Sequence, residues 1–237
     1  MNRTIRISLI LFFLLLSNNL SADGIIIEKI KHPYVQTGET EIELNLISQD
    51  DQQDQPDNLQ SYQLSIGKSW QDKISGEINF IGEKFKGGGF NFEEVEIEVN
   101  YQMTEQGEYW ADYGVQFELE KSFGDHIWEV GSLFIAEKEF GKFSHTVNVG
   151  VSFESGDDID NELESKFIWQ TRYRYRPFFE PALEYFLGED TQALGPAFQS
   201  TFALGQARKL HVETAVLFGL DNKSADQTIR FLIEFEF

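Results

Sequence analysis

The chain has 237 residues, with 40 acidic side chains against 19 basic ones and a net charge of −21 at neutral pH. This balance argues against nucleic acid as a partner, because phosphate backbones are bound by lysine and arginine. There is no cysteine, which excludes a disulfide framework, a thiol nucleophile and a thiolate metal site. Aromatic residues make up 14% of the sequence, which argues against a disordered acidic chain.

The first predicted element is a secretory signal peptide, residues 1–22. Arg3 and Arg6 precede an apolar run at 9–16, and small residues follow at Ser21 and Ala22. A basic start, an apolar centre and a small-residue cleavage site are typical of a secretory leader. The alternative is a membrane anchor, but about eight apolar residues are too few for a span that needs about 20. We expect cleavage after Ala22.

Residues 23–40 form a separate unit that precedes any regular pattern. They contain an apolar patch at 25–27 and the tract Lys31-His32-Pro33-Tyr34-Val35. The sequence leaves two placements open: a segment outside the following domain, or a segment tucked into it.

From Glu41 onward, apolar and polar residues alternate with a period of two, which predicts β-strands with one apolar face. The clearest internal example is 94–101, where valine, isoleucine and tyrosine alternate with three glutamates and an asparagine. Polar runs at 50–60, 156–160 and 221–226 are predicted loops. The predicted strands lie near 42–46, 62–70, 74–80, 94–101, 111–120, 128–135, 147–153, 167–175, 180–187, 197–205, 210–218 and 228–237.

These strands predict an all-β fold, a transmembrane antiparallel up-and-down barrel of about twelve strands at 41–237, with ten or fourteen as alternatives. The charged face must line the lumen, because charge at the centre of a bilayer is costly. An even strand count places both chain ends on one side. Connections after even-numbered strands are mostly short and those after odd-numbered strands mostly longer, which assigns the short turns and both ends to the periplasm.

The last strand carries a further signal. Counting back from the terminus, Phe237, Phe235, Ile233, Phe231 and Ile229 form an apolar ladder. The strand resembles the closing strand of bacterial outer-membrane barrels, whose terminal aromatic belongs to the signal read by the barrel-assembly machinery. The resemblance implies that Phe237, Phe235 and Ile233 form an assembly signal.

Several other stretches resemble an uncharacterised family of predicted outer-membrane barrel proteins from Gram-negative bacteria. The family implies the fold and a bacterial outer-membrane location, but brings no known activity. We assign residues 23–40 to a periplasmic N-terminal segment. The stretches are 31–35, 101–114, 137–143, 169–175, 179–185 and the last strand.

The strand pattern directs many charged side chains into the lumen. Arg172 and Arg174 should meet Glu180 and Glu184 across a hairpin, because their strands are neighbours. One interpretation is an ion-pair network that fills the barrel; the other is a transverse field that orients a polar solute in a pore. The candidate lumen-facing residues are Glu94, Glu96, Glu98, Asp112, Glu118, Arg172, Arg174, Glu180, Glu184, Arg230 and Glu234.

Enzyme chemistry has little support in the sequence. A membrane-embedded esterase would need a serine beside a histidine, but Ser144 and His145 are adjacent in a strand and point to opposite faces. His211 lacks an obvious serine partner in the sequence. No two histidines lie at metal-ligand spacing, so neither a metal nor a cofactor is expected.

The sequence therefore predicts a monomeric outer-membrane barrel that contacts lipid and, during assembly, the barrel-assembly machinery. Its function is predicted as a narrow channel for small polar solutes, or a structural barrel filled by its own charges. The alternatives are an outer-membrane enzyme of the lipase or esterase type and a barrel that binds another protein at its surface or in the periplasm.

Overall fold

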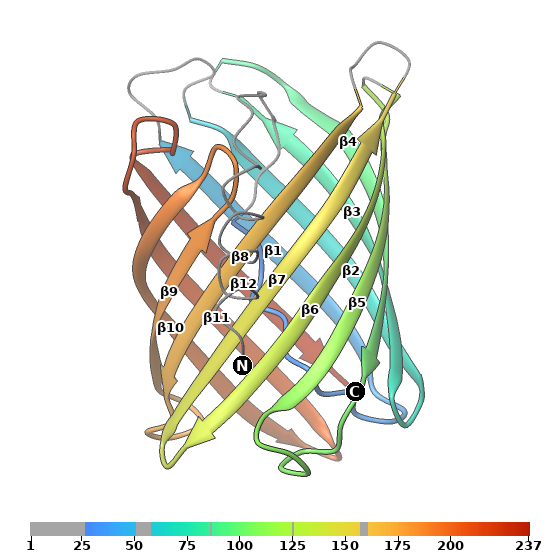
Figure 1. Cartoon of the computed structure of the whole chain (residues 1–237), viewed down its shortest axis with the longest axis vertical. Coiled ribbons are helices and arrows are strands. Elements are labelled where there is room, and N and C mark those ends of the chain that lie inside the picture. The colour runs from blue at the N-terminus through green and yellow to red at the C-terminus, as the bar shows by residue number, and fades with distance from the viewer. Residues whose placement is uncertain (1–26, 51–57, 86, 125, 157–160) are drawn as a thin grey trace, which may run out of the picture.

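The computed structural model describes residues 27–50, 58–85, 87–124, 126–156 and 161–237. The predicted signal peptide and its cleavage site lie outside these residues. Twelve strands follow one another along the described chain (Figure 1). They are β1 (Thr40–Asp50), β2 (Gln60–Gln71), β3 (Ile74–Lys84), β4 (Phe90–Gln102), β5 (Asp112–Ser122), β6 (Trp128–Phe140), β7 (Phe143–Ser155), β8 (Glu162–Tyr173), β9 (Glu180–Leu187), β10 (Gln192–Gly205), β11 (Arg208–Gly219) and β12 (Gln227–Glu236).

The strands form one closed antiparallel barrel in which each pairs with its neighbours in the sequence. Closure comes from β1 and β12, where Leu44 lies opposite Ile233 and Ile47 opposite Arg230. The predicted fold class and the count of twelve are confirmed. The tenth strand, which has the weakest alternation in the sequence, is the longest, with 14 residues.

Side chains sort by face. Outward positions expose large apolar residues along most strands, such as Ile66, Ile97 and Val151. Inward positions are mostly polar or charged, such as Glu43, Asn79 and Gln116. A closed sheet satisfies the backbone hydrogen bonds between its strands, so an apolar skin over a polar interior suits a barrel surrounded by lipid. Within the described ranges, no helix is long and apolar enough to cross a membrane.

The two ends of the barrel differ in their connections. At one end, here the turn end, the links include Asp72–Lys73 and Gln206–Ala207, and both the start of β1 and the end of β12 lie there. Gln206 and Ala207 have φ of 54° and 62°, as a two-residue hairpin turn of this twist requires. The other end, the loop end, carries longer links such as 220–226.

Exposed aromatic side chains surround the turn end. Tyr175 packs edge-on against Phe179, and Phe143 packs against Tyr173 with ring centroids 5.0 Å apart. The loop end has its own pairs, Tyr62 with Phe90 and Phe92 with Phe123. Aromatic belts at both ends of an apolar band are the pattern of a bilayer-spanning barrel.

Candidate functional site in the barrel lumen

The N-terminal segment enters the barrel, and its contacts define the candidate site. Residues 27–36, here the lumen segment, precede β1 and run inside the sheet (Figure 1). Side chains of the segment contact inward-facing residues of β1, β4, β5, β6, β8 and β12. Residues 27–36, which belong to the unit predicted at 23–40, thus contact the inner wall of the barrel.

One side of the lumen segment is apolar. Ile27 and Ile30 are each only 2% exposed and belong to a buried cluster on the wall formed by β8 to β11. This apolar wall faces a lumen that is otherwise polar, so without the segment it would be exposed to water. The inward side chains of the wall are Ile168, Phe186, Ala193, Ala197, Ala215 and Leu217.

The lysines of the segment lie against carboxylates instead. Lys29 Nζ forms ion pairs with Glu43 of β1 and, at 2.5 Å, with Glu234 of β12. Lys31 Nζ lies 2.5 Å from Glu98 of β4. Each of these carboxylates is less than 10% exposed. Buried charges need a partner of opposite sign. The lysines of the segment and the carboxylates of the wall therefore neutralise one another.

Neutral side chains fix the backbone of the segment. Asn148 of β7 accepts a hydrogen bond from the N–H of Lys31 at 3.0 Å and donates one to its carbonyl at 2.9 Å. Gln102 of β4 accepts from the N–H of Val35 at 2.9 Å, and Arg230 donates to the carbonyl of Glu28. The segment has no sheet partner, so the wall satisfies these backbone groups.

Further along the segment, two ring side chains bind acidic residues. His32 Nδ1 lies 2.6 Å from Glu137 of β6, and the hydroxyl of Tyr34 donates to Asp112 of β5 at 2.9 Å. Ser144 also donates to Glu137, at 2.6 Å. Ser144 thus faces the lumen, whereas His145 packs against Phe143 and Trp169, so this serine and histidine form no catalytic pair.

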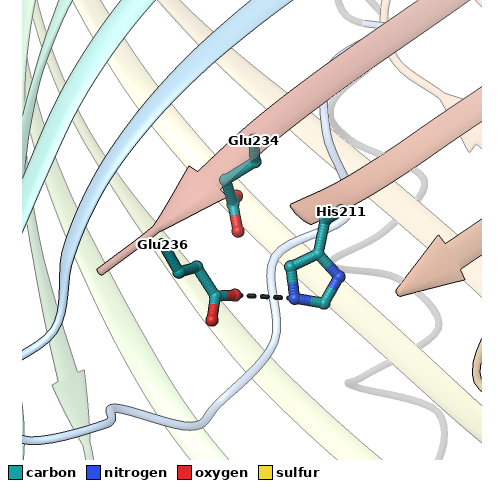
Figure 2. A group of neighbouring side chains, drawn as sticks. All are labelled: His211, Glu234 and Glu236. Atoms are coloured by element: carbon teal, nitrogen blue, oxygen red, sulfur yellow. Dashed lines mark ion pairs between the residues drawn. The ribbon is translucent and has the colours of Figure 1, made fainter. Parts of the chain in front are cut away.

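A second cluster joins β11 and β12 near the turn end (Figure 2). His211, Glu234 and Glu236 have potential metal-ligand atoms within 4.8 Å of one another. His211 Nε2 lies 2.6 Å from Glu236, whose second oxygen lies 2.6 Å from Lys209 Nζ. Glu234 already binds Lys29. Three positive or protonatable groups therefore share these two carboxylates, which accounts for the cluster as an ion-pair network without a metal.

His211 also has a partner that the sequence did not reveal. Its Nδ1 lies 2.8 Å from Thr201 Oγ1, directly opposite it in the β10–β11 pairing. Hydroxyl, imidazole and the carboxylate of Glu236 thus form a line like that of a nucleophile, its base and an orienting acid. Lys209, which binds the same carboxylate, favours a structural role for this line.

The predicted arginine and glutamate pairs form only in part. Arg172 Nε lies 3.4 Å from Glu180, as expected across the hairpin. Glu184 instead binds Arg230 of β12 at 2.9 Å, with both side chains fully buried, and Arg174 pairs with Glu139 of β6. The prediction that Glu184 and Arg174 find their partners across the hairpin is therefore wrong. The curvature of the barrel brings a more distant strand closer to each of them than the hairpin neighbour.

The other predicted lumen residues lie on inward positions of β4, β5 and β12. Glu98, Asp112 and Glu234 contact the lumen segment. Glu96 accepts from Asn79 at 2.9 Å, and Glu118 lies 3.6 Å from Lys166. Glu94 lies farther toward the loop end, opposite Ser122.

Inward glycines make room for several of these long side chains. Gly67 lies opposite Glu41, Gly131 opposite Glu118, and Gly150 opposite Lys166. A Cβ atom at each glycine would collide with the charged side chain opposite. Each side chain therefore lies flat over its glycine, along the wall.

A cavity of about 490 Å³ remains beside the lumen segment, toward the turn end. Its lining includes Lys31, His32, Arg172, Glu180, His211 and Glu236. Charges of both signs thus face a space large enough for a small polar solute.

The fold is shared with known outer-membrane channels. A channel from Pseudomonas putida F1 superposes with a TM-score of 0.57 at 14% identity, covering 85% of this chain and 96% of that one. The NanC porin gives 0.55 at 11%, over 84% and 98% of the chains. The KdgM porin, solved with disordered oligogalacturonate, gives 0.54 at 10%, over 83% and 98%. At these identities the likeness concerns the fold. No family model and no curated protein sequence matches the chain.

Proposed function

We propose that this protein is an outer-membrane channel for small polar solutes and that its own lumen segment controls the passage. The signal-peptide pattern, the apolar skin with its aromatic belts and the fold shared with porins support the location. In this proposal, the turn end and both chain ends face the periplasm, and the loop end faces outward. The alternatives are a structural barrel that never conducts and an enzyme in the lumen.

The observation that carries the proposal is the match between the segment and the two walls around it. Ile27 and Ile30 cover an apolar wall, while Lys29 and Lys31 neutralise buried carboxylates. A barrel filled only for stability could use side chains of its own strands. This one uses a chain segment joined to the wall mostly by ion pairs and hydrogen bonds, which are exchangeable with water and solutes.

Single-channel recording in planar bilayers tests the proposal. We expect the full mature chain to show low conductance with brief openings, and a variant lacking residues 23–36 to conduct continuously. Because deletion leaves Glu43, Glu98 and Glu234 unpaired, folding of the variant is first checked by the mobility of the unheated barrel in gels. A folded deletion variant that insulates the bilayer would contradict the channel.

A cross-linked variant tests the segment without deleting it. The natural chain has no cysteine, so Lys31→Cys with Glu98→Cys offers one reactive pair. A cleavable bifunctional thiol reagent should abolish the openings, and reduction of the linker should restore them. The matched control is Lys31→Cys alone with the same reagent, whose openings should persist. Openings that survive a completed cross-link would exclude control by the segment.

The orientation can be tested in whole cells. Asn222→Cys lies in the connection between β11 and β12 at the loop end, and Gln106→Cys in the turn between β4 and β5. A membrane-impermeant maleimide should label the first in intact cells and the second only after the outer membrane is opened. The reverse labelling pattern would invert the proposed orientation.

A further inference from the structure

The wall of the lumen binds the main chain of the lumen segment as well as its side chains. Asn148 accepts from the N–H of Lys31 and donates to its carbonyl, so one side chain satisfies both main-chain groups of one residue. Gln102 accepts from the N–H of Val35. Asn148 and Gln102 are no more than 6% exposed. Every peptide residue except proline carries the same N–H and carbonyl, so these contacts do not depend on the side chains of the bound segment.

The wall also comes unusually close to the segment at one glycine. Gly114 of β5 lies beside Pro33, and a Cβ atom at Gly114 would lie 3.0 Å from the Cα atom of Pro33. Glycine is the residue that permits such a close approach between a strand and another backbone. The lumen is therefore shaped to receive a main chain that belongs to no helix or strand.

Carboxylates beside these contacts bind the side chains that the segment brings. Lys29 lies between two carboxylates, and the ammonium group of Lys31 lies 2.5 Å from a third. Ile30, between the two lysines, packs into the apolar cluster. The peptide groove, as we name this surface, consists of Glu43, Glu98, Gln102, Gly114, Asn148 and Glu234.

Release of the segment would leave the groove without its partners. Asn148 would lose an N–H and a carbonyl, and Glu98 would lose an ammonium group. Buried polar groups and charges without partners are costly. A solute that brings an N–H, a carbonyl and an ammonium group to the same places would restore these contacts, and a peptide that contains lysine carries all three.

We infer that the peptide groove binds short peptides that contain lysine, and that such peptides are the solutes of the channel. This inference rests on the proposed channel function. The lumen segment then acts as an internal copy of the solute, because it occupies the groove with the same main-chain and ammonium groups. Peptide and segment compete for Asn148 and Glu98, so binding of the peptide is coupled to release of the segment.

The test is calorimetric titration with the blocked pentapeptide acetyl-AKLKA-amide, in neutral detergent at an ionic strength of about 0.15 M. The protein is the full mature chain with Ile30→Asp, which expels the segment from the apolar cluster and vacates the groove. We expect saturable binding to this variant, and apparent binding at least about ten-fold weaker to the natural chain, whose own segment competes. Gel mobility checks the fold of the variant. If it does not fold, the natural chain is titrated at higher peptide concentration.

Two matched peptides separate the main-chain contact from the charge. N-methylation of the second lysine removes the N–H that Asn148 accepts, and acetyl-AELEA-amide reverses the charge. Each should bind at least about ten-fold more weakly than acetyl-AKLKA-amide.

Two protein variants, made in the Ile30→Asp chain, locate the contact. Asn148→Leu should weaken binding about ten-fold and abolish the difference between the plain and the N-methylated peptide. The control is Gln63→Leu, which removes an inward amide that donates to Ser65 of its own strand at 3.2 Å, and should bind as its parent does.

Each outcome decides one statement. Equal affinity for the lysine and glutamate peptides, equal affinity for the plain and N-methylated peptides, or no binding to either chain would overturn the peptide inference. Conduction without peptide binding overturns it too but leaves the channel intact. Peptide binding by a barrel that never conducts, even without residues 23–36, overturns the channel and retains the groove as a binding site.

Discussion

The two halves of the lumen treat charge in opposite ways. In the turn half, most of the buried carboxylates among the described residues lie beside a cation: Lys29 for Glu43, Lys31 for Glu98 and Arg230 for Glu184. In the loop half, glutamates lie opposite glutamates. The same residue type thus holds a segment in place in one half and lies opposite other glutamates in the other. The difference shows that position relative to cations decides what a lumen glutamate does.

The largest effect is expected from breaking a compensated pair in the turn half. Glu184→Ala removes the closer of the two carboxylates beside the fully buried Arg230 and leaves only Glu213, at 3.8 Å, which should cost about 3 kcal/mol. The free energy of unfolding in urea, followed by gel mobility, measures the loss. The control is Glu139→Ala, which breaks the half-exposed pair with Arg174 and should cost no more than about 1 kcal/mol. Equal losses in the two variants would refute the comparison.

A smaller effect is expected where the lumen segment meets the apolar wall. Ile30→Asp places an unpaired carboxylate in a cluster where Ile30 is 2% exposed, so the segment should leave the wall rather than bury the charge. Conductance should then approach that of the variant without residues 23–36. Ile30→Leu conserves volume and should keep the low conductance of the natural chain. An Ile30→Asp barrel that stays closed would show that the ion pairs alone retain the segment.

In the loop half, removal of a glutamate should raise the stability of the barrel instead of lowering it. Glu129→Gln removes a charge that lies opposite both Glu120 and Glu154, and relief of repulsion should stabilise the barrel by up to about 1 kcal/mol. Urea unfolding at low and high salt measures the gain, which should shrink as salt screens the repulsion among these three glutamates. A loss of stability on this substitution would mean that the Glu129 carboxylate makes favourable contacts that outweigh its repulsion by Glu120 and Glu154.

The smallest effect is expected at Thr201. Thr201→Val removes the hydroxyl beside His211 and should cost about 1 kcal/mol. If the line of Thr201, His211 and Glu236 is structural, the natural chain should not react with a fluorophosphonate probe that labels activated hydroxyl groups. Labelling that disappears in Thr201→Val would instead support the enzyme alternative.

The fold could be read from the sequence because alternation is a local property. In the strand at 94–101, Val95 and Ile97 mark the apolar face and the glutamates between them mark the polar face. Repetition of this pattern along the chain predicts a closed barrel. The ion pair between Arg172 and Glu180 could also be predicted from the sequence, because a short turn joins their strands. The pair between Glu184 and Arg230 could not be predicted, because its two residues are 46 positions apart in the sequence and meet across a curved wall.

The candidate site was harder to predict from the sequence, because it depends on where the N-terminal segment lies. The tract from Lys31 to Val35 has too little periodicity to show a partner, and its contacts are with residues as distant as Asn148. Asn148 and Gln102 are buried and uncharged, so the sequence pattern does not distinguish them from other inward-facing polar residues. The alternation of apolar Ile27 and Ile30 with Lys29 and Lys31 was the available signal for a segment between two unlike walls.

The inward glycines have a consequence for how the bore of such a barrel can change. Because Glu118 lies in the recess above Gly131, the residue beneath the charge sets how far the carboxylate projects. A single methyl group at Gly131 would lift that carboxylate toward the axis, while the strand number and the lipid-facing surface stay the same. The width of the lumen can therefore be adjusted from beneath its charged lining, one recess at a time, without a change in the number of strands.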